Sequence, residues 1–270
     1  MTLNEAVTVL CEAGVPDALH DAREIFRHFG SFSEADLLLR RAESEDDSIL
    51  SAVSRRAQRE PLQYILGEAS FYREVYKVTP DCLIPRFDTE VLVDYAVKNL
   101  PSGAHFLDLC TGSGCIAIST LKSTENTTAT GVDVSDGALA VAAENRGLLQ
   151  VCNRLTLVKA DVLEKKIDGE FFAVLSNPPY VTPDAYSALE REIYYEPELA
   201  FVGGTDGGDF YRRITELYRD SIPEEGFIAY EIGYDQADLL KEIAAKNGMN
   251  CEIISDLGSN PRVAVLRRIV

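Results

Sequence analysis

The sequence predicts an α/β protein in two parts: a small N-terminal helical bundle and a Rossmann-like domain with a mostly parallel, seven-stranded sheet. From about residue 88 onward, apolar runs alternate with helical segments, which is typical of a parallel sheet covered on both faces. Residues 1 to about 66 instead show helical spacing of apolar residues and no convincing strand. We place the boundaries at 1–68 for the helical domain, 69–87 for a hairpin linker and 88–270 for the second domain.

The helical part is predicted from spacing and capping signals. Leu3, Ala6 and Leu10 follow a helical period. Ser33 precedes a short apolar segment as an N-cap, and Asp46 or Asp47 is placed to open a fourth helix. Four short helices that share an apolar face form a small bundle.

In the second part, the order of apolar runs predicts the sheet. The predicted strands are 105–110, 128–134, 155–162, 171–176, 227–232, 250–255 and 263–269, and the predicted helices are 114–123, 136–149 and 236–247. The last two strands follow each other without a long helix, which allows one of them to run antiparallel.

Composition excludes several classes of protein. The formal net charge of −18 disfavours non-specific nucleic-acid binding, which depends on Lys and Arg neutralising phosphates. The six cysteines form no C-x-x-C pair, and the three histidines do not cluster with them, so no metal site is expected. No membrane span or targeting leader is recognisable, and we expect a cytoplasmic monomer.

A glycine loop follows the first strand of the second domain. Gly112 and Gly114 permit a tight backbone that leaves room for a ligand, at the edge where doubly wound sheets bind nucleotides. Asp133 ends the next strand, where a carboxylate can accept both ribose hydroxyls. The same spacing also satisfies the dinucleotide fingerprint, so the loop alone does not distinguish the cofactors.

Two further aspartates favour S-adenosylmethionine. Asp108 is placed to face a methionine ammonium instead of a pyrophosphate, and Asp161-Val162 is placed to contact an adenine amino group and ring. We predict that S-adenosyl-L-methionine binds here and leaves as S-adenosyl-L-homocysteine. The predicted cofactor-binding residues are Asp108, Thr111, Gly112, Ser113, Gly114, Asp133, Val134, Asp161, Val162 and Asn177.

The segment Asn177-Pro178-Pro179-Tyr180 is the predicted catalytic segment. Two prolines fix the backbone and hold their carbonyls rigid. The Asn177 side-chain oxygen and the Pro178 carbonyl can then accept both hydrogens of an NH₂ group, and the Tyr180 ring can stack on a planar amide or base. This arrangement predicts methyl transfer to a planar nitrogen by positioning, with no strong general base.

Over nearly its whole length the chain resembles the peptide chain release factor glutamine methyltransferases, the HemK/PrmC family. The segments that carry the resemblance are PLQYILG (61–67), Phe71, IPRFDTE (84–90), LDLCTGSGCIAI (107–118), VDVS (132–135), NPPYV (177–181), EPELAFVGGTDGGDFYRR (196–213), YEIG (230–233) and NPR (260–262). The family usually has Pro and Glu where this chain has Phe87 and Asp88.

The resemblance implies a substrate and further site residues. The implied substrate is the glutamine of the Gly-Gly-Gln motif in class I peptide chain release factors, methylated on N5, with the helical domain helping to dock the factor. Asn177, Pro178, Pro179 and Tyr180 would bind that amide. Arg86 and Glu90 are implied near the site rim, and Glu196 is included among the predicted substrate-binding residues.

Three alternatives remain at this point. An adenine-N6 nucleic-acid methyltransferase shares the NPPY segment, although the acidic charge and the lack of an evident basic recognition domain disfavour it. A non-catalytic methyltransferase-fold scaffold would be expected to lose Asn177 or the glycines, which are intact. A nicotinamide oxidoreductase would leave NPPY unexplained.

Overall fold

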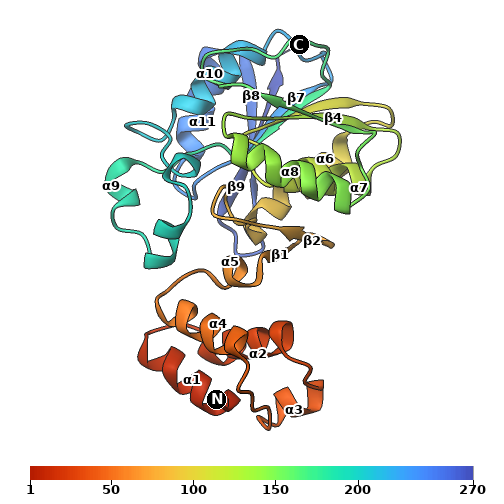
Figure 1. Ribbon diagram of the computed structural model, residues 1–270. Helices are drawn as coiled ribbons and strands as arrows, with labels where there is room; N and C mark the ends of the chain where they lie inside the picture. The colour runs from red at the N-terminus through yellow and green to blue at the C-terminus, as the bar shows by residue number, and fades with distance from the viewer. Residues whose placement is uncertain (270) are drawn as a thin grey trace. The chain divides into compact units, whose positions relative to one another are not determined.

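The computed structural model of the chain describes residues 1–269 and divides into two compact units (Figure 1). The first unit comprises residues 1–68 together with a short excursion, 190–195. The second comprises residues 69–189 and the chain from Glu196 onward. The predicted hairpin, 69–87, belongs to the second unit.

The first unit is a helical bundle. Its helices from the N-terminal part are α1 (Leu3–Glu12), α2 (Ala18–Phe29), α3 (Glu34–Leu38), α4 (Asp47–Ala57) and α5 (Leu62–Leu66). The predicted caps are confirmed, because the Ser33 side chain accepts from the Asp36 backbone N–H, and Asp46 caps α4. Leu10, Ile25 and Phe26 are fully buried in its core. The sequence did not predict the fifth helix, α5.

The excursion 190–195 contains the 3₁₀ helix η2 (Arg191–Tyr195) and folds with this bundle. The Glu192 carboxylate accepts a hydrogen bond from Arg56 Nη1, in α4, at 3.1 Å. It accepts a second from Arg59 Nε, just after α4, at 2.5 Å. The Tyr195 hydroxyl donates to the Gln58 carbonyl at 2.9 Å. A segment from the middle of the chain is therefore part of the N-terminal unit.

The second unit contains the hairpin and the large sheet. Its strands are β1 (Glu68–Phe71), β2 (Glu74–Lys77), β3 (His105–Leu109), β4 (Thr128–Asp133), β5 (Leu155–Lys159), β6 (Ala173–Ser176), β7 (Phe227–Glu231), β8 (Met249–Ser255) and β9 (Pro261–Arg268). Its helices are η1 (Phe87–Thr89), α6 (Glu90–Asn99), α7 (Cys115–Ser123), α8 (Asp136–Leu148), α9 (Pro183–Tyr186), η3 (Glu198–Ala200), α10 (Asp209–Tyr218) and α11 (Ala237–Lys246).

The large sheet confirms the predicted fold class. It has seven strands in the order β5-β4-β3-β6-β7-β9-β8. All neighbours pair in parallel except β9, which runs antiparallel to both β7 and β8. From β3 the chain continues to β4 and β5 on one side, and then returns to β6 on the other side. Such a reversal opens a crevice at the carboxyl ends of the strands.

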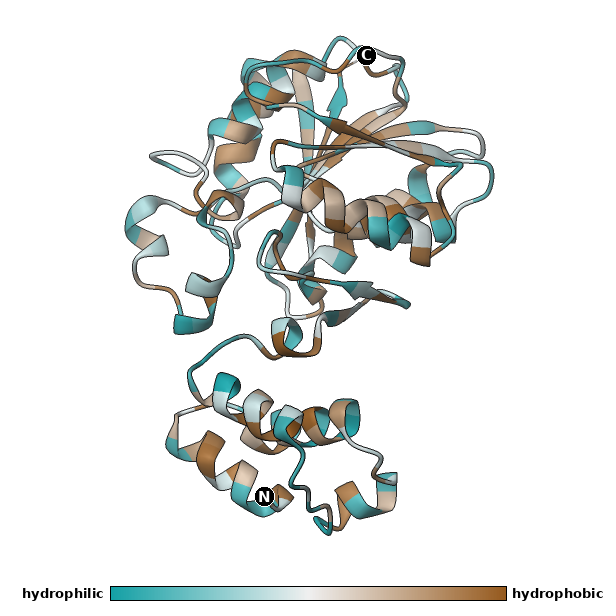
Figure 2. Ribbon diagram, viewed as in Figure 1, coloured by the Kyte–Doolittle hydropathy of each residue, from teal (hydrophilic) through white to brown (hydrophobic). Residues whose placement is uncertain are grey.

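Helices cover both faces of this sheet (Figure 1). Buried residues of α6 and α7 pack on one face together with Phe71 and Tyr76 of the hairpin. On the other face, α10 and α11 contribute Tyr211, Ile214 and Leu240. The central strands β3, β6 and β7 are accordingly buried and apolar through much of their length (Figure 2), as expected for strands covered on both faces. Among the described residues, no helix combines the length and apolar character that a bilayer crossing requires.

Candidate active site

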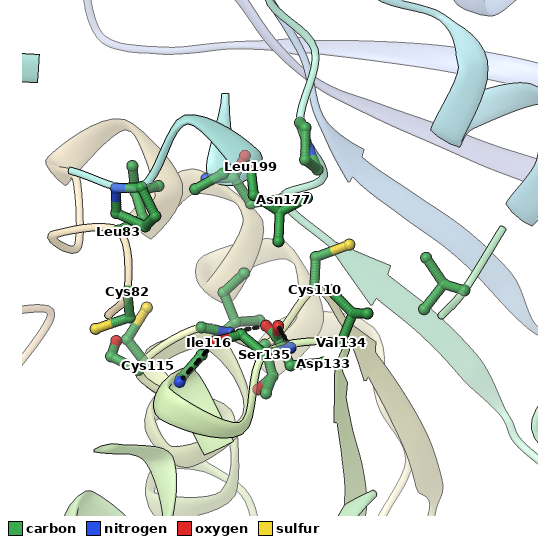
Figure 3. A pocket seen from close by; sticks show the side chains of 18 of the residues that line it. Cys82, Leu83, Cys110, Cys115, Ile116, Asp133, Val134, Ser135, Asn177 and Leu199 are labelled. Atoms are coloured by element: carbon green, nitrogen blue, oxygen red, sulfur yellow. Dashed lines mark hydrogen bonds between the residues drawn. The ribbon is translucent and has the colours of Figure 1, made fainter. Parts of the chain in front are cut away.

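A cavity lies where the strand order reverses. It is lined by residues that follow β3, β4, β5 and β6, and by the segments 81–89 and 197–210. Asp133 and Val134 lie at one side of this cavity and Asn177 and Leu199 at the other (Figure 3). The cofactor and catalytic segments predicted from the sequence therefore share one cavity.

The glycine loop needs its glycines for backbone geometry. Gly112 and Gly114 have φ of 54° and 81°, in the left-handed region that side chains disfavour. A Cβ on Gly114 would also lie 3.1 Å from Ile118 and 3.3 Å from Ala142. A Cβ on Gly112 would meet nothing within 4 Å, so the loop leaves open space where it lines the cavity.

Asp108 lies beneath this loop and does not line the cavity. Its Oδ2 accepts hydrogen bonds from the Thr111 hydroxyl at 2.6 Å and from the Ala117 N–H at 3.2 Å. Its Oδ1 is buried and has no hydrogen-bond partner among the described residues. Burial raises the pKa of Asp108 to about 7, because a buried carboxylate loses its hydration. The carboxyl group holds the loop and keeps one unused acceptor.

Asp133 and Asp161 both line the cavity and are oriented by backbone N–H groups. Asp133 Oδ2 accepts from Gly112 N–H at 2.9 Å, and its Oδ1 accepts from Ser135 N–H at 3.0 Å. Burial raises the pKa of Asp133, although these bonds partly oppose that effect. Asp161 Oδ1 accepts from Leu163 N–H at 2.8 Å. Asp161 lies two residues beyond the end of β5, so the predicted strand was too long.

The remaining lining fits a nucleoside cofactor. Ser113 lines the cavity, and its Oγ is buried without a partner among residues 1–269. A buried unpaired hydroxyl is costly unless a ligand satisfies it. The apolar side chains of Val134, Val162 and Leu163 also face this space, as an adenine ring requires. Thr111 belongs to the lining as well, whereas Gly114 does not.

Asn177 and Pro179 line the same cavity, whereas Pro178 and Tyr180 do not. The backbone of the NPPY segment lies directly against two glycines of the segment 203–208. A Cβ on Gly203 would lie 2.2 Å from the Pro179 carbonyl oxygen, and one on Gly207 would lie 2.2 Å from that of Tyr180. These close approaches explain why glycines occupy positions 203 and 207 of the GG-x-DG pattern in the segment 196–213.

Thr89 and Glu231 are site residues that the sequence reasoning did not select. Asn177 Nδ2 donates to the Thr89 hydroxyl at 3.3 Å, and Thr89 in turn donates to Glu231. The Tyr180 hydroxyl also donates to Glu231 at 3.2 Å. Thr89 belongs to the segment IPRFDTE and Glu231 to YEIG, both of which carry the family resemblance. Because the two segments are far apart in the sequence, the sequence gives no reason to connect these residues.

The three remaining predicted residues have different surroundings. Arg86 lines the cavity and pairs with Glu196, whose other oxygen accepts from the Ile84 N–H at 2.9 Å. Burial raises the pKa of Glu196, against the effect of Arg86. Glu90 instead accepts from the Tyr72 N–H at 2.6 Å and does not line the cavity. It anchors the hairpin.

The two departures from the family pattern occupy the same stretch. Phe87 is 76% exposed, so it contributes little to the core of the unit. Asp88 pairs with Arg262 at 3.1 Å. The shorter acidic side chain therefore still has a basic partner.

A doubly wound sheet with a nucleoside-type cavity and an NPPY segment in its wall defines the class of the second unit as a methyltransferase domain. Residues 87–195 match the methyltransferase small domain, and residues 2–67 match the PrmC N-terminal domain. A crystal structure of a methyltransferase from Pyrococcus furiosus has a similar fold, with a TM-score of 0.54 and 19% identity, over 72% of this chain and 89% of that one.

Curated relatives identify the family. The release factor glutamine methyltransferase of Thermodesulfovibrio yellowstonii is 37% identical over 93% of this chain and 92% of its own length. That of Fusobacterium nucleatum is 33% identical over 99% of this chain and 78% of its own length. The chain belongs to the release factor glutamine methyltransferase family. No group of three or more His, Cys, Asp or Glu side chains within residues 1–269 is arranged to hold a metal ion.

Proposed function

We propose that this protein transfers a methyl group from S-adenosyl-L-methionine to the side-chain amide nitrogen, N5, of the glutamine in the Gly-Gly-Gln motif of class I peptide chain release factors, and so modulates translation termination. The observation that carries the proposal is the position of Asn177 in the wall of the cavity that also contains Asp133, Asp161 and the glycine loop. A substrate nitrogen held by Asn177 would face the same space as the cofactor.

The protein's part in this reaction is positioning. The cofactor supplies a methyl group on a sulfonium, which needs no further activation. Asn177 Oδ1 and the Pro178 carbonyl accept the two N–H groups of the glutamine amide, and Tyr180 packs on its planar face. When bound, the cofactor would supply the methyl group and its sulfur would keep the methyl–sulfur electron pair, while Asn177 and Pro178 hold the amide nitrogen that takes the methyl group and then releases one proton to water. Holding the reacting atoms about 3 Å apart supplies much of the rate enhancement.

Cofactor contacts are assigned to the opposite side of the cavity. We assign Asp133 to the ribose hydroxyls, Asp161 to the adenine amino group and Val134 and Val162 to the adenine ring. Ser113, Thr111 and Gly112 line the space for the methionine part. Asp108 acts beneath the loop, where its Oδ2 holds the Thr111 hydroxyl and the Ala117 N–H, and its Oδ1 is a buried acceptor without a partner among residues 1–269. We further propose that residues 1–68 help to dock the release factor, and that the enzyme works as a cytoplasmic monomer.

The test is methyl transfer from labelled S-adenosylmethionine to three acceptors: a purified class I release factor, the same factor with its motif glutamine changed to alanine, and adenine-containing DNA. We expect label only on the intact factor. Label on the alanine variant would contradict glutamine as the acceptor. Label on DNA would favour the adenine-N6 alternative, and cofactor binding without any transfer would favour a scaffold.

A further inference from the structure

We propose that Glu231 is a positioning residue for methyl transfer, which acts through Thr89 to fix the side-chain amide of Asn177 with its oxygen toward the substrate. The proposal rests on the function proposed above. Glu231 touches neither substrate nor cofactor in this scheme. It determines instead which end of the Asn177 amide is presented to the cavity.

The geometry joins one carboxylate to both polar side chains of the NPPY segment. Glu231 ends β7, is 2% exposed, and lies outside the cavity lining. Its Oε2 accepts from the Thr89 hydroxyl at 2.5 Å, and its Oε1 accepts from the Tyr180 hydroxyl at 3.2 Å. The Thr89 oxygen accepts from Asn177 Nδ2 at 3.3 Å. Thr89 is itself 2% exposed, so water does not readily replace these bonds.

The direction of these hydrogen bonds follows from chemistry. An ionised carboxylate accepts but does not donate, and a threonine hydroxyl has only one proton. Because that proton is given to Glu231, the Thr89 oxygen is available to Asn177 only as an acceptor. Asn177 must therefore turn its NH₂ group toward Thr89, which leaves its amide oxygen for the substrate. A neutral residue at position 231 would remove this constraint, since the chain of donors could then reverse.

The surroundings of Glu231 make its charge dependent on pH. Burial raises the pKa of Glu231 to about 7, while the bonds from Thr89 and Tyr180 lower it. The other titratable or charged groups that interact electrostatically with Glu231 are Arg262 from β9, Asp88 from η1, Tyr211 from α10 and Cys115 from α7. Below the pKa the carboxyl group can donate to Thr89, and the orientation of Asn177 is no longer fixed. We therefore expect transfer to decrease as the pH falls through about 7.

Substitution of Glu231→Gln tests the inference in the intact enzyme. With saturating cofactor, we expect kcat to fall about 10- to 100-fold, the size of effect expected when a hydrogen bond to a charged group is lost in the transition state. The KM for release factor and the Kd for cofactor should stay within about threefold. The wild-type profile of kcat/KM against pH should show a rise near pH 7 that the variant lacks.

Two further sets of variants separate positioning from a general effect of buried substitutions. Thr89→Val should reproduce the loss in kcat, and Thr89→Ser should restore most of it, because serine keeps the hydroxyl. This pair also carries the test if E231Q fails to fold. Tyr230→Phe is the matched control: it removes a buried hydroxyl next to Glu231 that bonds Thr215 at 2.9 Å, outside the network. Its kcat and pH profile should match the wild type.

The outcomes distinguish this inference from the proposed function. The proposed function would be refuted if the wild-type enzyme labels no release factor. The role of Glu231 would be refuted if the wild type labels the factor and E231Q keeps the wild-type kcat and pH profile. A second measurement needs no substrate. In ¹⁵N-labelled protein, the chemical shift of the Asn177 side-chain NH₂ group should titrate near pH 7 in the wild type but not in E231Q. A wild-type resonance that does not change with pH would overturn the inference independently of the acceptor.

Discussion

Asn177 carries the most specific chemical demand on a single residue of this chain. Its NH₂ group is bound by Thr89, so its oxygen is the group left for a substrate amide. We expect Asn177→Ala to reduce single-turnover methyl transfer by about 100-fold or more, an effect similar to loss of a preorganised transition-state contact. Cofactor affinity, measured by calorimetry, should remain within a few-fold. A variant that keeps most of its kcat would rule out this role.

Asp133 is expected to act on binding and not on chemistry. Its two oxygens accept from the Gly112 and Ser135 N–H groups, and each retains a lone pair for a ribose hydroxyl. Asp133→Ala should weaken cofactor binding about 10-fold or more, as loss of charge-assisted hydrogen bonds predicts. The control is Asp136→Ala, which removes an exposed carboxylate that pairs with Lys159. Equal cofactor affinity of the two variants in calorimetry would remove Asp133 from the ribose site.

At the scale of elements, the turn from β3 into α7 depends on its glycines, and Gly114 is the more constrained of the two. Gly114 combines a φ of 81° with a close approach to Ile118 and Ala142. Gly114→Ala should therefore lower the free energy of unfolding by about 1–3 kcal/mol and weaken cofactor binding.

Gly147 in α8 provides the opposite case within the same unit. A Cβ there would meet nothing within 4 Å, and the residue lies within the last turn of the helix. Gly147→Ala should raise the free energy of unfolding by about 0.5–1 kcal/mol, because alanine loses less backbone entropy in a helix. Urea unfolding compares the two variants, and a shift of the same sign in both would contradict the argument from backbone conformation.

The elements best predicted from the sequence were those with a strong apolar period. The strands β3, β4, β6 and β7 and the helices α7, α8 and α11 were found because burial on two faces, or on one helical face, leaves a regular pattern. The helix α10 was missed, although Tyr211, Ile214 and Tyr218 lie on its buried face. The glycine-rich segment that precedes α10 and the charged residues within it concealed that spacing.

For the site, the sequence predicted groups at strand ends but not their partners. Asp133, Asp161 and Asn177 all line one cavity because parallel strands bring their carboxyl ends to the same edge. Thr89 and Glu231 are 142 residues apart, and only the tertiary packing shows that they form one hydrogen-bonded chain. Likewise, Glu90 accepts a hydrogen bond from the Tyr72 N–H, and the fold of the hairpin brings these two groups together.

At the scale of the whole molecule, the excursion 190–195 depends on the helical bundle for its order. Glu192 receives hydrogen bonds from both Arg56 and Arg59. We expect Glu192→Ala to increase the amide exchange rates of residues 190–195 about 10-fold or more, since charge-assisted hydrogen bonds are lost. Hydrogen exchange with mass spectrometry measures this. Glu190→Ala, which removes an exposed side chain of the same segment, should leave the rates unchanged, and equal rates in both variants would contradict the role of Glu192.

The buried acids also give global stability a dependence on pH. The pKa of Asp108 is raised from 3.8 to about 7, so the folded state binds this proton more tightly than the unfolded state does. The resulting stabilisation is fully present below about pH 4 and is lost as the pH rises through about 7.

Asp108→Asn should therefore reduce the loss of unfolding free energy between pH 5 and pH 8, measured by urea unfolding without cofactor. The asparagine oxygen can still accept from Thr111 and Ala117. Asp136→Asn, at an exposed position, should retain the wild-type difference. An Asp108 variant with the wild-type difference would show that this carboxyl group titrates normally.

The excursion 190–195 means that the polypeptide passes between the two units three times: after residue 68, after residue 189 and after residue 195. A protein whose domains are joined by one linker separates into independent pieces when that linker is cut. Here a single cleavage at the first passage would yield a fragment of residues 1–68 that retains Arg56 and Arg59, while the larger fragment retains Glu192. The hydrogen bonds from Arg56 and Arg59 to Glu192 would then join the two fragments, so that one cut at the first passage would not by itself remove every contact between them.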